Sequence, residues 1–306
     1  MTNINSKKYL KNHPLDIWRN KEVTGLLLDF FIGNFTQGGI SQCLAENLVL
    51  TAWENRKTLD KETLRRECDR LFRLAKKEYF YKITETLPLS LIDLSGVSSF
   101  LDVGANKLTA INYFAEKYPV IKELIGVDIV PQKKVFIDSL RSKYFQISSA
   151  ADILPVEENS IDFINIQFVF HHFTDLESIV KMLSLCKRAL KSDGTLLLWE
   201  ESFAEKIDQN KLNENKERGI EIDDELTQKF YALDERMRWE FIVVNDWIIN
   251  VSNVHMPWTG EYYTWSEWEL ILAKSGFTLS KEYDFGLRKN GLLKQGVHMQ
   301  GYFKKN

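Results

Sequence analysis

The chain has 306 residues, of which 44% are hydrophobic and 27% charged, and its 40 basic residues nearly balance 43 acidic ones. This composition is typical of a globular protein and excludes a disordered, collagen-like or coiled-coil chain. It also argues against a broad nucleic-acid interface, which requires a dense basic surface. Aromatic residues are frequent, at 12%, and include eight Trp.

The sequence carries no signal for export or for crossing a membrane. Residues 1–18 lack the apolar core of a signal peptide. The longest apolar stretch, Leu26 to Ile32, is interrupted by Asp29 and is far shorter than the roughly 20 residues of a membrane span. The three scattered cysteines form neither a disulfide scaffold nor a zinc site. We therefore expect a cytoplasmic protein without a metal ion.

The N-terminal part is predicted to be helical. Apolar positions recur at steps of three and four between Asp60 and Leu87, which indicates one long amphipathic helix ended by Pro88. Two shorter helices are predicted over residues 15–32 and 41–56. We predict that residues 1–95 form a helical cap without a catalytic motif.

Strands and helices alternate from residue 96 onward. The predicted strands are residues 99–103, 124–127, 144–148, 161–168 and 195–199, and the predicted helices are residues 109–118, 133–143 and 176–190. Because these strands are almost entirely apolar, they predict a parallel sheet with helices on both faces.

The last third begins with a segment, residues 202–262, that is too long for a simple connection. A charged helix is predicted over residues 205–230, and the following residues are rich in aromatic side chains. A further helix is predicted over residues 265–275, and two final strands over residues 277–284 and 297–303. Residues 96–306 thus form one predicted domain with an insertion at about residues 202–262.

Ligands of open parallel sheets bind beyond the carboxyl ends of the strands. The first predicted strand ends at Asp102 and Gly104, where a glycine lets backbone amides approach a ligand closely. The second ends at Asp128, a carboxylate suited to accept hydrogen bonds from ribose hydroxyls. The third leads to Asp152 and Ile153, an acid for an adenine amino group beside an apolar side chain for the ring face.

Each of these features is weak when taken alone, since an Asp after a strand is often a helix cap or a solvated residue. Their order is more specific, because the acids follow one another at intervals of about 25 residues. The segments FLDVGAN, GVDI, ADILPVEENSIDFINIQFVFHHF and LCKRALKSDGTLLLWEE resemble the successive motifs of class I S-adenosylmethionine-dependent methyltransferases, most closely those that methylate small molecules. The resemblance covers residues 97–202 and, more loosely, residues 265–306.

The resemblance implies a Rossmann-like α/β fold with a seven-stranded sheet whose final strand runs antiparallel, and S-adenosylmethionine as cofactor. It also implies roles for the residues at the strand ends. These are Asp102 and Gly104 at the methionine end, Asp128 at the ribose, Asp152 and Ile153 at the adenine, and Gln167 near the sulfonium. Ile129 completes the usual acid-plus-apolar pair with Asp128, and Asn106 and Phe168 are further candidate cofactor-binding residues.

The loop after the first strand departs from the family, which usually has glycines where this chain has Asn106 and Leu108. Asn tolerates a left-handed backbone, whereas a bulky Leu108 could crowd the methionine moiety. Either the loop is rearranged around an intact site or cofactor binding has been lost. The retained acids for ribose and adenine favour the intact site.

Methyl transfer from a sulfonium requires a positioned nucleophile and, for a hydroxyl or carbon acid, a base. His172 is the first candidate base and His171 the second, because both follow the fourth strand and imidazole titrates near neutral pH. The alternative is that one of them caps or packs under the next helix. His255, within the insertion, is a competing candidate.

Five of the eight Trp lie between residues 239 and 268. The insertion could need these aromatics for its own small core. It could also form, with the N-terminal helices, a lid whose aromatic faces grip a planar or cationic substrate. The two explanations are compatible. The candidate substrate-binding residues are Trp239, Trp258, Tyr262 and Tyr263.

The sequence therefore predicts methyl transfer to an O, N or C atom of a small molecule, such as a secondary metabolite. It predicts no nucleic-acid or membrane partner and leaves a homodimer open. The alternatives are a catalytically inactive cofactor-binding protein on the same fold and a peptide or protein methyltransferase.

Overall fold

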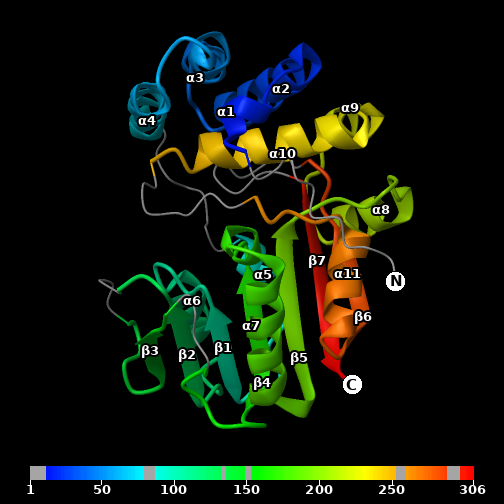
Figure 1. Ribbon diagram of the computed structural model, residues 1–306. Helices are drawn as coiled ribbons and strands as arrows, with labels where there is room; N and C mark the ends of the chain where they lie inside the picture. Colours follow the sequence, from blue (N-terminus) through cyan, green and yellow to red (C-terminus); the bar gives the residue numbers. More distant parts are fainter. Residues whose placement is uncertain (1–11, 79–86, 132–135, 149–152, 253–259, 288–296) are drawn as a thin grey trace. The chain divides into compact units, whose positions relative to one another are not determined.

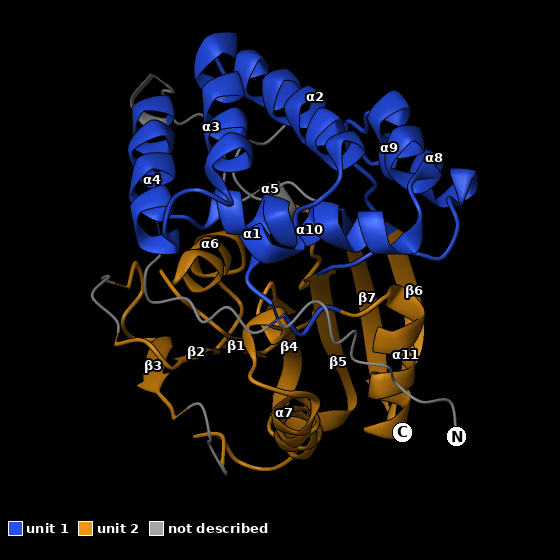
Figure 2. Cartoon of the chain, turned by 45° about the horizontal axis from the view of Figure 1, so that its top comes forward, with its two compact units in different colours: residues 1–84, 201–262, 284–298 blue, residues 85–200, 263–283, 299–306 orange. Residues whose placement is uncertain are grey.

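The computed structural model describes residues 12–78, 87–131, 136–148, 153–252, 260–287 and 297–306. The chain divides into two compact units, each built from several chain segments (Figure 2). Unit 1 contains residues 1–84, 201–262 and 284–298, and unit 2 contains residues 85–200, 263–283 and 299–306.

Unit 2 is built around a seven-stranded sheet with the order β3-β2-β1-β4-β5-β7-β6 (Figure 1). The strands are β1 (Ser99–Val103), β2 (Glu123–Asp128), β3 (Ser142–Gln146), β4 (Ile161–Gln167), β5 (Leu190–Glu201), β6 (Phe277–Asp284) and β7 (His298–Lys305). Neighbouring strands from β3 to β5 are parallel. β7 runs antiparallel to β5, and the predicted seven-stranded α/β fold is confirmed.

Helices cover both faces of the sheet. They are α5 (Leu87–Ser90), α6 (Thr109–Lys117), the 3-10 helix η2 (Phe170–His172), α7 (Leu176–Ala189) and α11 (Trp265–Lys274). Successive residues of a strand point to opposite faces. On β7, Tyr302 meets the ring of Phe163 at 6.5 Å, in the cluster that includes Phe114 of α6, whereas Phe303 meets Trp265 of α11 at 6.3 Å. α6 and α11 therefore pack on opposite faces.

Side-chain caps set where the helices begin. The Asp175 carboxylate accepts a hydrogen bond from the Ser178 N–H at 2.8 Å and so caps the N-terminus of α7. α11 begins with a capping box in which Thr264 and Glu267 satisfy each other's backbone N–H groups. These local signals are readable from the sequence, and both helices begin where it predicts them.

Unit 1 is helical and contains a large hydrophobic core. Its helices are α1 (Pro14–Ile17), α2 (Lys21–Gln37), α3 (Gln42–Asn55), α4 (Lys61–Glu78), α8 (Gln209–Glu217), α9 (Asp224–Ala232) and α10 (Glu235–Ile249). Phe30 of α2 meets Phe241 of α10 at 5.8 Å, and the buried Glu240 accepts hydrogen bonds from the N–H groups of Arg19 and Asn20. The N-terminal helices and the insertion therefore share one core (Figure 2).

The helix predicted over residues 133–143 is wrong in the part that is described. Residues 136–141 are irregular, and β3 begins at Ser142. The Asp138 carboxylate accepts hydrogen bonds from the Leu140 and Arg141 N–H groups, which offers the backbone a turn in place of a helix. The Arg141 guanidinium donates to the carbonyl groups of Ala115, Tyr118, Pro119 and Ile121, so it ties this turn to the end of α6.

Two other predicted helices have different bounds. The charged helix predicted over residues 205–230 is two helices, α8 and α9, interrupted at Gly219, whose φ is 80°. The long helix predicted to reach Leu87 is described as α4 up to Glu78, and Pro88 lies within α5. A proline is tolerated in the first turn of a helix, where its missing N–H is not needed.

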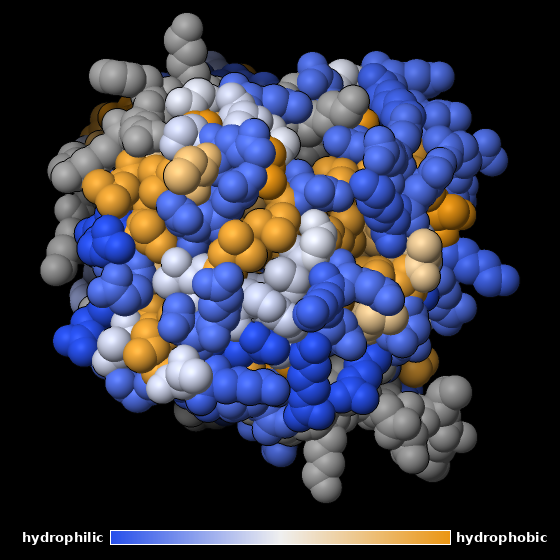
Figure 3. Space-filling view, turned by 90° about the horizontal axis from the view of Figure 1, so that it is seen from above, coloured by the Kyte–Doolittle hydropathy of each residue, from blue (hydrophilic) through white to orange (hydrophobic). Residues whose placement is uncertain are grey.

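Among the described residues, no helix is both long and apolar enough to cross a membrane. The face drawn in Figure 3 mixes hydrophilic residues with smaller hydrophobic patches, as is usual for a globular surface.

Candidate functional site

The chain leaves β1 through a loop with three positive φ angles, at Gly104 (79°), Asn106 (38°) and Leu108 (60°). A Cβ atom at Gly104 would overlap the side chain of Val169, so this position requires glycine for space as well as for conformation. Leu108 is fully buried in the core cluster of unit 2. Its left-handed backbone, which costs about 1–2 kcal/mol, thus directs the side chain into the core.

Asp128 connects the end of β2 to this loop. Its Oδ2 accepts a hydrogen bond from the Asn106 N–H at 2.7 Å, and its Oδ1 accepts one from the Val130 N–H at 3.1 Å. A carboxylate has about four acceptor sites, so these two bonds leave capacity for two further donors. Because Asp128 is only partly buried, it can both hold the loop and bind a ligand.

Asp102 is buried, with 5% of its surface exposed, and lies beside Asn165 in the register of β1 and β4. The Asn165 Nδ2 donates a hydrogen bond to Asp102 Oδ1 at 2.7 Å. The Asn165 Oδ1 has no hydrogen-bond partner among the residues that the structure describes. Asp102 lies two residues before Gly104, so this polar pair lies close to the loop.

The other predicted cofactor residues also lie at strand ends. Ile129 follows β2 and is 43% exposed, and Ile153 is 67% exposed. Gln167 is the last residue of β4, and Phe168 follows with a φ of 57° and its N–H bonded to the Trp199 carbonyl. Asp152 lies outside the described residues. Their contacts with a cofactor remain a prediction.

A buried carboxylate organises the segment after β4. Glu200 is fully buried, and its Oε1 accepts hydrogen bonds from the Val169 and Phe170 N–H groups at 2.9 and 2.7 Å. Its Oε2 lies 2.6 Å from His171 Nδ1. The His171 ring is 3% exposed, and the partly buried His172 ring lies 3.9 Å away, centroid to centroid. Glu200 therefore fixes the backbone and the first imidazole together.

The candidate substrate residues belong to different units. Trp239 is fully buried in unit 1, between Phe203 and Tyr262, and the Tyr262 hydroxyl donates to Asp246 at 2.6 Å. Tyr263 is buried in unit 2 and meets Trp268 at 5.0 Å. His255 and Trp258 lie outside the described residues. The described members contribute to the cores of their units, as the first explanation of the aromatic residues expects.

The sequence reasoning missed Asn165 and Glu200. The signal for Glu200 was present, since an apolar strand ends in two adjacent acids, Glu200 and Glu201. Asn165 was harder to find, because only the register of β1 and β4 shows that it lies beside Asp102. Among the described residues, no group of three His, Cys, Asp or Glu is arranged to hold a metal ion.

A family model described as a methyltransferase domain matches residues 101–198. The matched segment extends from β1 into β5 and contains Asp102, Asp128, Gln167 and both histidines of η2. Residues 101–198 of the chain therefore form a methyltransferase domain. S-adenosylmethionine is the methyl donor that this domain and the resemblance imply.

Solved structures are similar to this chain at low sequence identity. The pyocyanin biosynthetic protein PhzM has a TM-score of 0.50 and 15% identity, over 91% of this chain and 72% of that chain. The mitomycin 7-O-methyltransferase MmcR has a TM-score of 0.46 and 14% identity, over 86% and 67%. A methyltransferase from Methanosarcina mazei has a TM-score of 0.40 and 14% identity, over 68% and 92%. No curated protein matches the sequence.

Proposed function

We propose that the methyltransferase methylates a small molecule, such as a secondary metabolite, and that a hydroxyl is the acceptor group that its geometry supports best. When bound, S-adenosylmethionine supplies an electrophilic methyl group on a positively charged sulfur. Asp128 would accept hydrogen bonds from the ribose hydroxyls, and the buried Asp102 would attract the methionine ammonium group. Ile129 and Ile153, both exposed, would cover the adenine ring.

The observation that most strongly supports a hydroxyl acceptor is the buried pair of Glu200 and His171. Because the carboxylate accepts at Nδ1, the proton of a neutral His171 lies on Nδ1 and Nε2 is the basic nitrogen. This is how a carboxylate orients an imidazole base in other enzymes. We therefore place His171 before His172 as the base, which reverses the order suggested by the sequence.

In the proposed step, an acceptor oxygen forms a bond to the methyl carbon while the bond between carbon and sulfur breaks. The acceptor proton moves to His171 Nε2, and Glu200 stabilises the resulting imidazolium. The electron pair of the broken bond would remain with the leaving sulfur, so the charge would balance. The role of the chain is to position the acceptor and to receive one proton.

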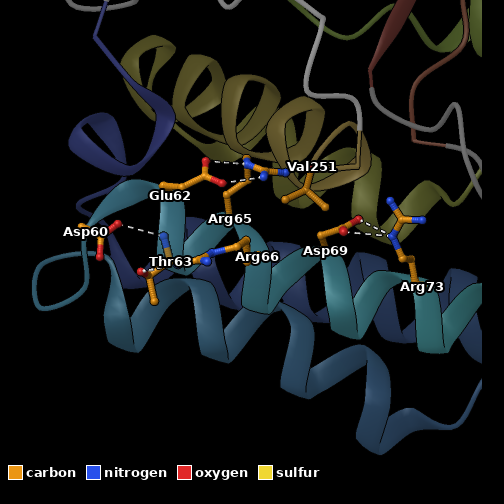
Figure 4. Close-up of polar contacts among 8 residues, drawn as sticks. All are labelled: Asp60, Glu62, Thr63, Arg65, Arg66, Asp69, Arg73 and Val251. Atoms are coloured by element: carbon orange, nitrogen blue, oxygen red, sulfur yellow. Dashed lines mark hydrogen bonds and ion pairs between the residues drawn. The ribbon is translucent and has the colours of Figure 1, made fainter.

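The charges of α4 support a small molecule over a nucleic acid. Four arginines lie on this helix, but three of them pair with acids on the same helix: Arg65 with Glu62, Arg70 with Glu67 and Arg73 with Asp69. Figure 4 shows two of these pairs, and Arg65 also reaches the Val251 carbonyl. Such pairing neutralises a basic face that would otherwise bind phosphates.

Isotope transfer tests this function. The protein is incubated with S-adenosylmethionine carrying a 13C methyl group and with a cell extract separated into molecules below and above about 1 kDa. We expect a 13C methyl group on a molecule of the small fraction, absent with His171→Ala. Label in the large fraction would support a peptide or protein acceptor. No label in either fraction, despite cofactor binding, would support the inactive protein.

A further inference from the structure

Gln300 of β7 is a fully buried primary amide. Neither its Nε2 nor its Oε1 has a hydrogen-bond partner among the residues that the structure describes. Burying an amide without partners costs free energy, so such groups in native proteins call for an explanation. A ligand that supplies the missing partners is one explanation.

The register places Gln300 near the carboxyl ends of the parallel strands. The Ser202 N–H donates to the Val297 carbonyl, and Lys304 Nζ donates to Thr195 Oγ1, so antiparallel pairing puts Gln300 opposite Trp199. Trp199 in turn lies beside Gln167, the last residue of β4. Gln300 is therefore two strand spacings, roughly 10 Å, across the sheet from Gln167.

Gln300 also shares a face of the sheet with the polar residues of the candidate site. The ring of Tyr302 meets that of Phe163, so the side chains of these residues lie on one face. Because side chains alternate along a strand, Gln300 is on the same face as Asn165 and Gln167. Besides the two amide atoms of Gln300, Asn165 Oδ1 on this face also has no partner in the described part of the chain.

We propose that Gln300 is a specificity-determining residue that binds the acceptor molecule. Its amide offers an N–H donor and a carbonyl acceptor side by side, so it would pair with a ligand edge that offers the same two groups, as a lactam does. The proposal rests on the proposed function, in which the acceptor lies next to the sulfonium near Gln167. Gln167 would then lie next to the sulfonium, and Gln300 would bind the acceptor molecule.

The thermal stability of a Gln300 variant distinguishes a ligand-binding role of this amide from a purely structural one. Met has a similar length and no polar group, so Gln300→Met removes the unpaired amide without leaving a large cavity. If the amide is unpaired in the free protein, the variant should have an unchanged or higher Tm. If a buried water or a packing role explains the amide, the Tm should fall, and this result would overturn the proposal.

Ser142 provides a matched control. It is 4% exposed, lies on the edge strand β3, and its Oγ also has no partner among the described residues. Ser142→Ala therefore removes an unpaired buried polar group far across the sheet from Gln300. It should leave ligand binding unchanged.

The binding test uses the full chain saturated with S-adenosylhomocysteine and labelled with 15N at glutamine. The side-chain NH2 signals of Gln300 are identified by their loss in Gln300→Met. We expect titration with 2-pyridone, a lactam, to shift these signals saturably. N-methyl-2-pyridone, which lacks the N–H donor, should bind at least tenfold more weakly. Gln300→Met should weaken 2-pyridone binding at least tenfold, and Ser142→Ala should not.

Unshifted Gln300 signals, or equal binding of 2-pyridone to wild type and Gln300→Met, would overturn the proposal. Calorimetry with S-adenosylhomocysteine on the same samples separates this failure from a failure of the proposed function. If the wild type does not bind S-adenosylhomocysteine, the proposed function fails. If it binds S-adenosylhomocysteine but 2-pyridone has no effect on Gln300, only the role of Gln300 fails.

Discussion

The Asp128 carboxylate accepts the backbone N–H of Asn106 at 2.7 Å, so the end of β2 holds the loop that follows β1. This bond stabilises a loop in which Asn106 and Leu108 both have positive φ without being glycine. The residue proposed to bind the ribose is thus also the residue that shapes the neighbouring loop. Loss of this carboxylate should therefore weaken cofactor binding in two ways, by removing the ribose acceptor and by loosening the loop after β1.

Asp128→Ala should weaken binding of S-adenosylhomocysteine by about 10- to 100-fold, since hydrogen bonds to charged groups contribute about 1.5–3 kcal/mol. Isothermal titration calorimetry measures the affinity. Glu123→Gln, at the other end of β2, is the control and should bind normally. Normal affinity of Asp128→Ala would show that Asp128 is not the ribose acceptor.

Gly104→Ala should lower the Tm more than Gly39→Ala does. Both glycines have positive φ, 79° and 86°, so both substitutions introduce the same backbone strain. A Cβ at Gly39 has nothing within 4 Å, whereas one at Gly104 overlaps Val169. Differential scanning calorimetry of the two variants isolates the cost of the overlap. Equal Tm values would mean that Val169 moves aside freely.

Glu200→Gln should lower the free energy of unfolding by about 1–3 kcal/mol, because the new NH2 group would face donors that the carboxylate now satisfies. Chemical denaturation measures this change. The partly exposed Glu282 lies on β6, and Glu282→Gln serves as a comparison in the same unit. A variant at position 200 as stable as the wild type would contradict the role of Glu200 in holding residues 169–171.

His171→Ala should reduce turnover of the labelled acceptor by about 100- to 10,000-fold, the usual contribution of a general base. Its affinity for S-adenosylhomocysteine should stay within about twofold of the wild type, because the base acts on the acceptor. His172→Ala should reduce turnover less. If His172→Ala is the more impaired variant in the 13C assay, the base is His172 and His171 only packs against Glu200.

Acid should destabilise the protein through His13. Its Nδ1 accepts the Leu15 N–H at the start of α1, and burial, with nearby Lys61, lowers the pKa of His13 from 6.5 to about 4. Because the unfolded chain binds this proton at higher pH than the folded chain, the stability contribution is full above pH 6.5 and is lost as pH falls toward 4. The Tm of His13→Asn should fall less than that of the wild type between pH 6.5 and 4.5. Parallel Tm curves would exclude this linkage.

The sequence was sufficient for elements in which the local signals agree with the fold. The helix predicted over residues 265–275 is α11, which begins with the Thr264–Glu267 capping box, and the strand predicted over residues 277–284 is β6, with the bounds observed. It failed at residues 136–141, where Asp138 accepts hydrogen bonds from the nearby Leu140 and Arg141 N–H groups, which favours a turn over a helix. The Arg141 guanidinium also donates to carbonyl groups that are distant in sequence, those of Ala115 and Ile121.

The candidate site was predictable only in part for a related reason. The acids after β1 and β2 follow strands in the sequence and can be found by their order. The partners of these residues come from other strands, so the pairs of Asp102 with Asn165 and of His171 with Glu200 depend on sheet register and strand order. A single sequence does not contain that register.

The core of unit 1 has a consequence for how the protein is made. Asn20 and Glu240 are 220 residues apart in the chain, and their side chains hydrogen-bond. During synthesis the N-terminal helices leave the ribosome first, yet their apolar faces have no complete partner until α10 is made. Contacts of such sequence separation slow folding and prolong the exposure of hydrophobic surface. The first helices to be synthesised are thus among the last to be buried, and nascent chains stopped before α10 are the ones most prone to aggregate.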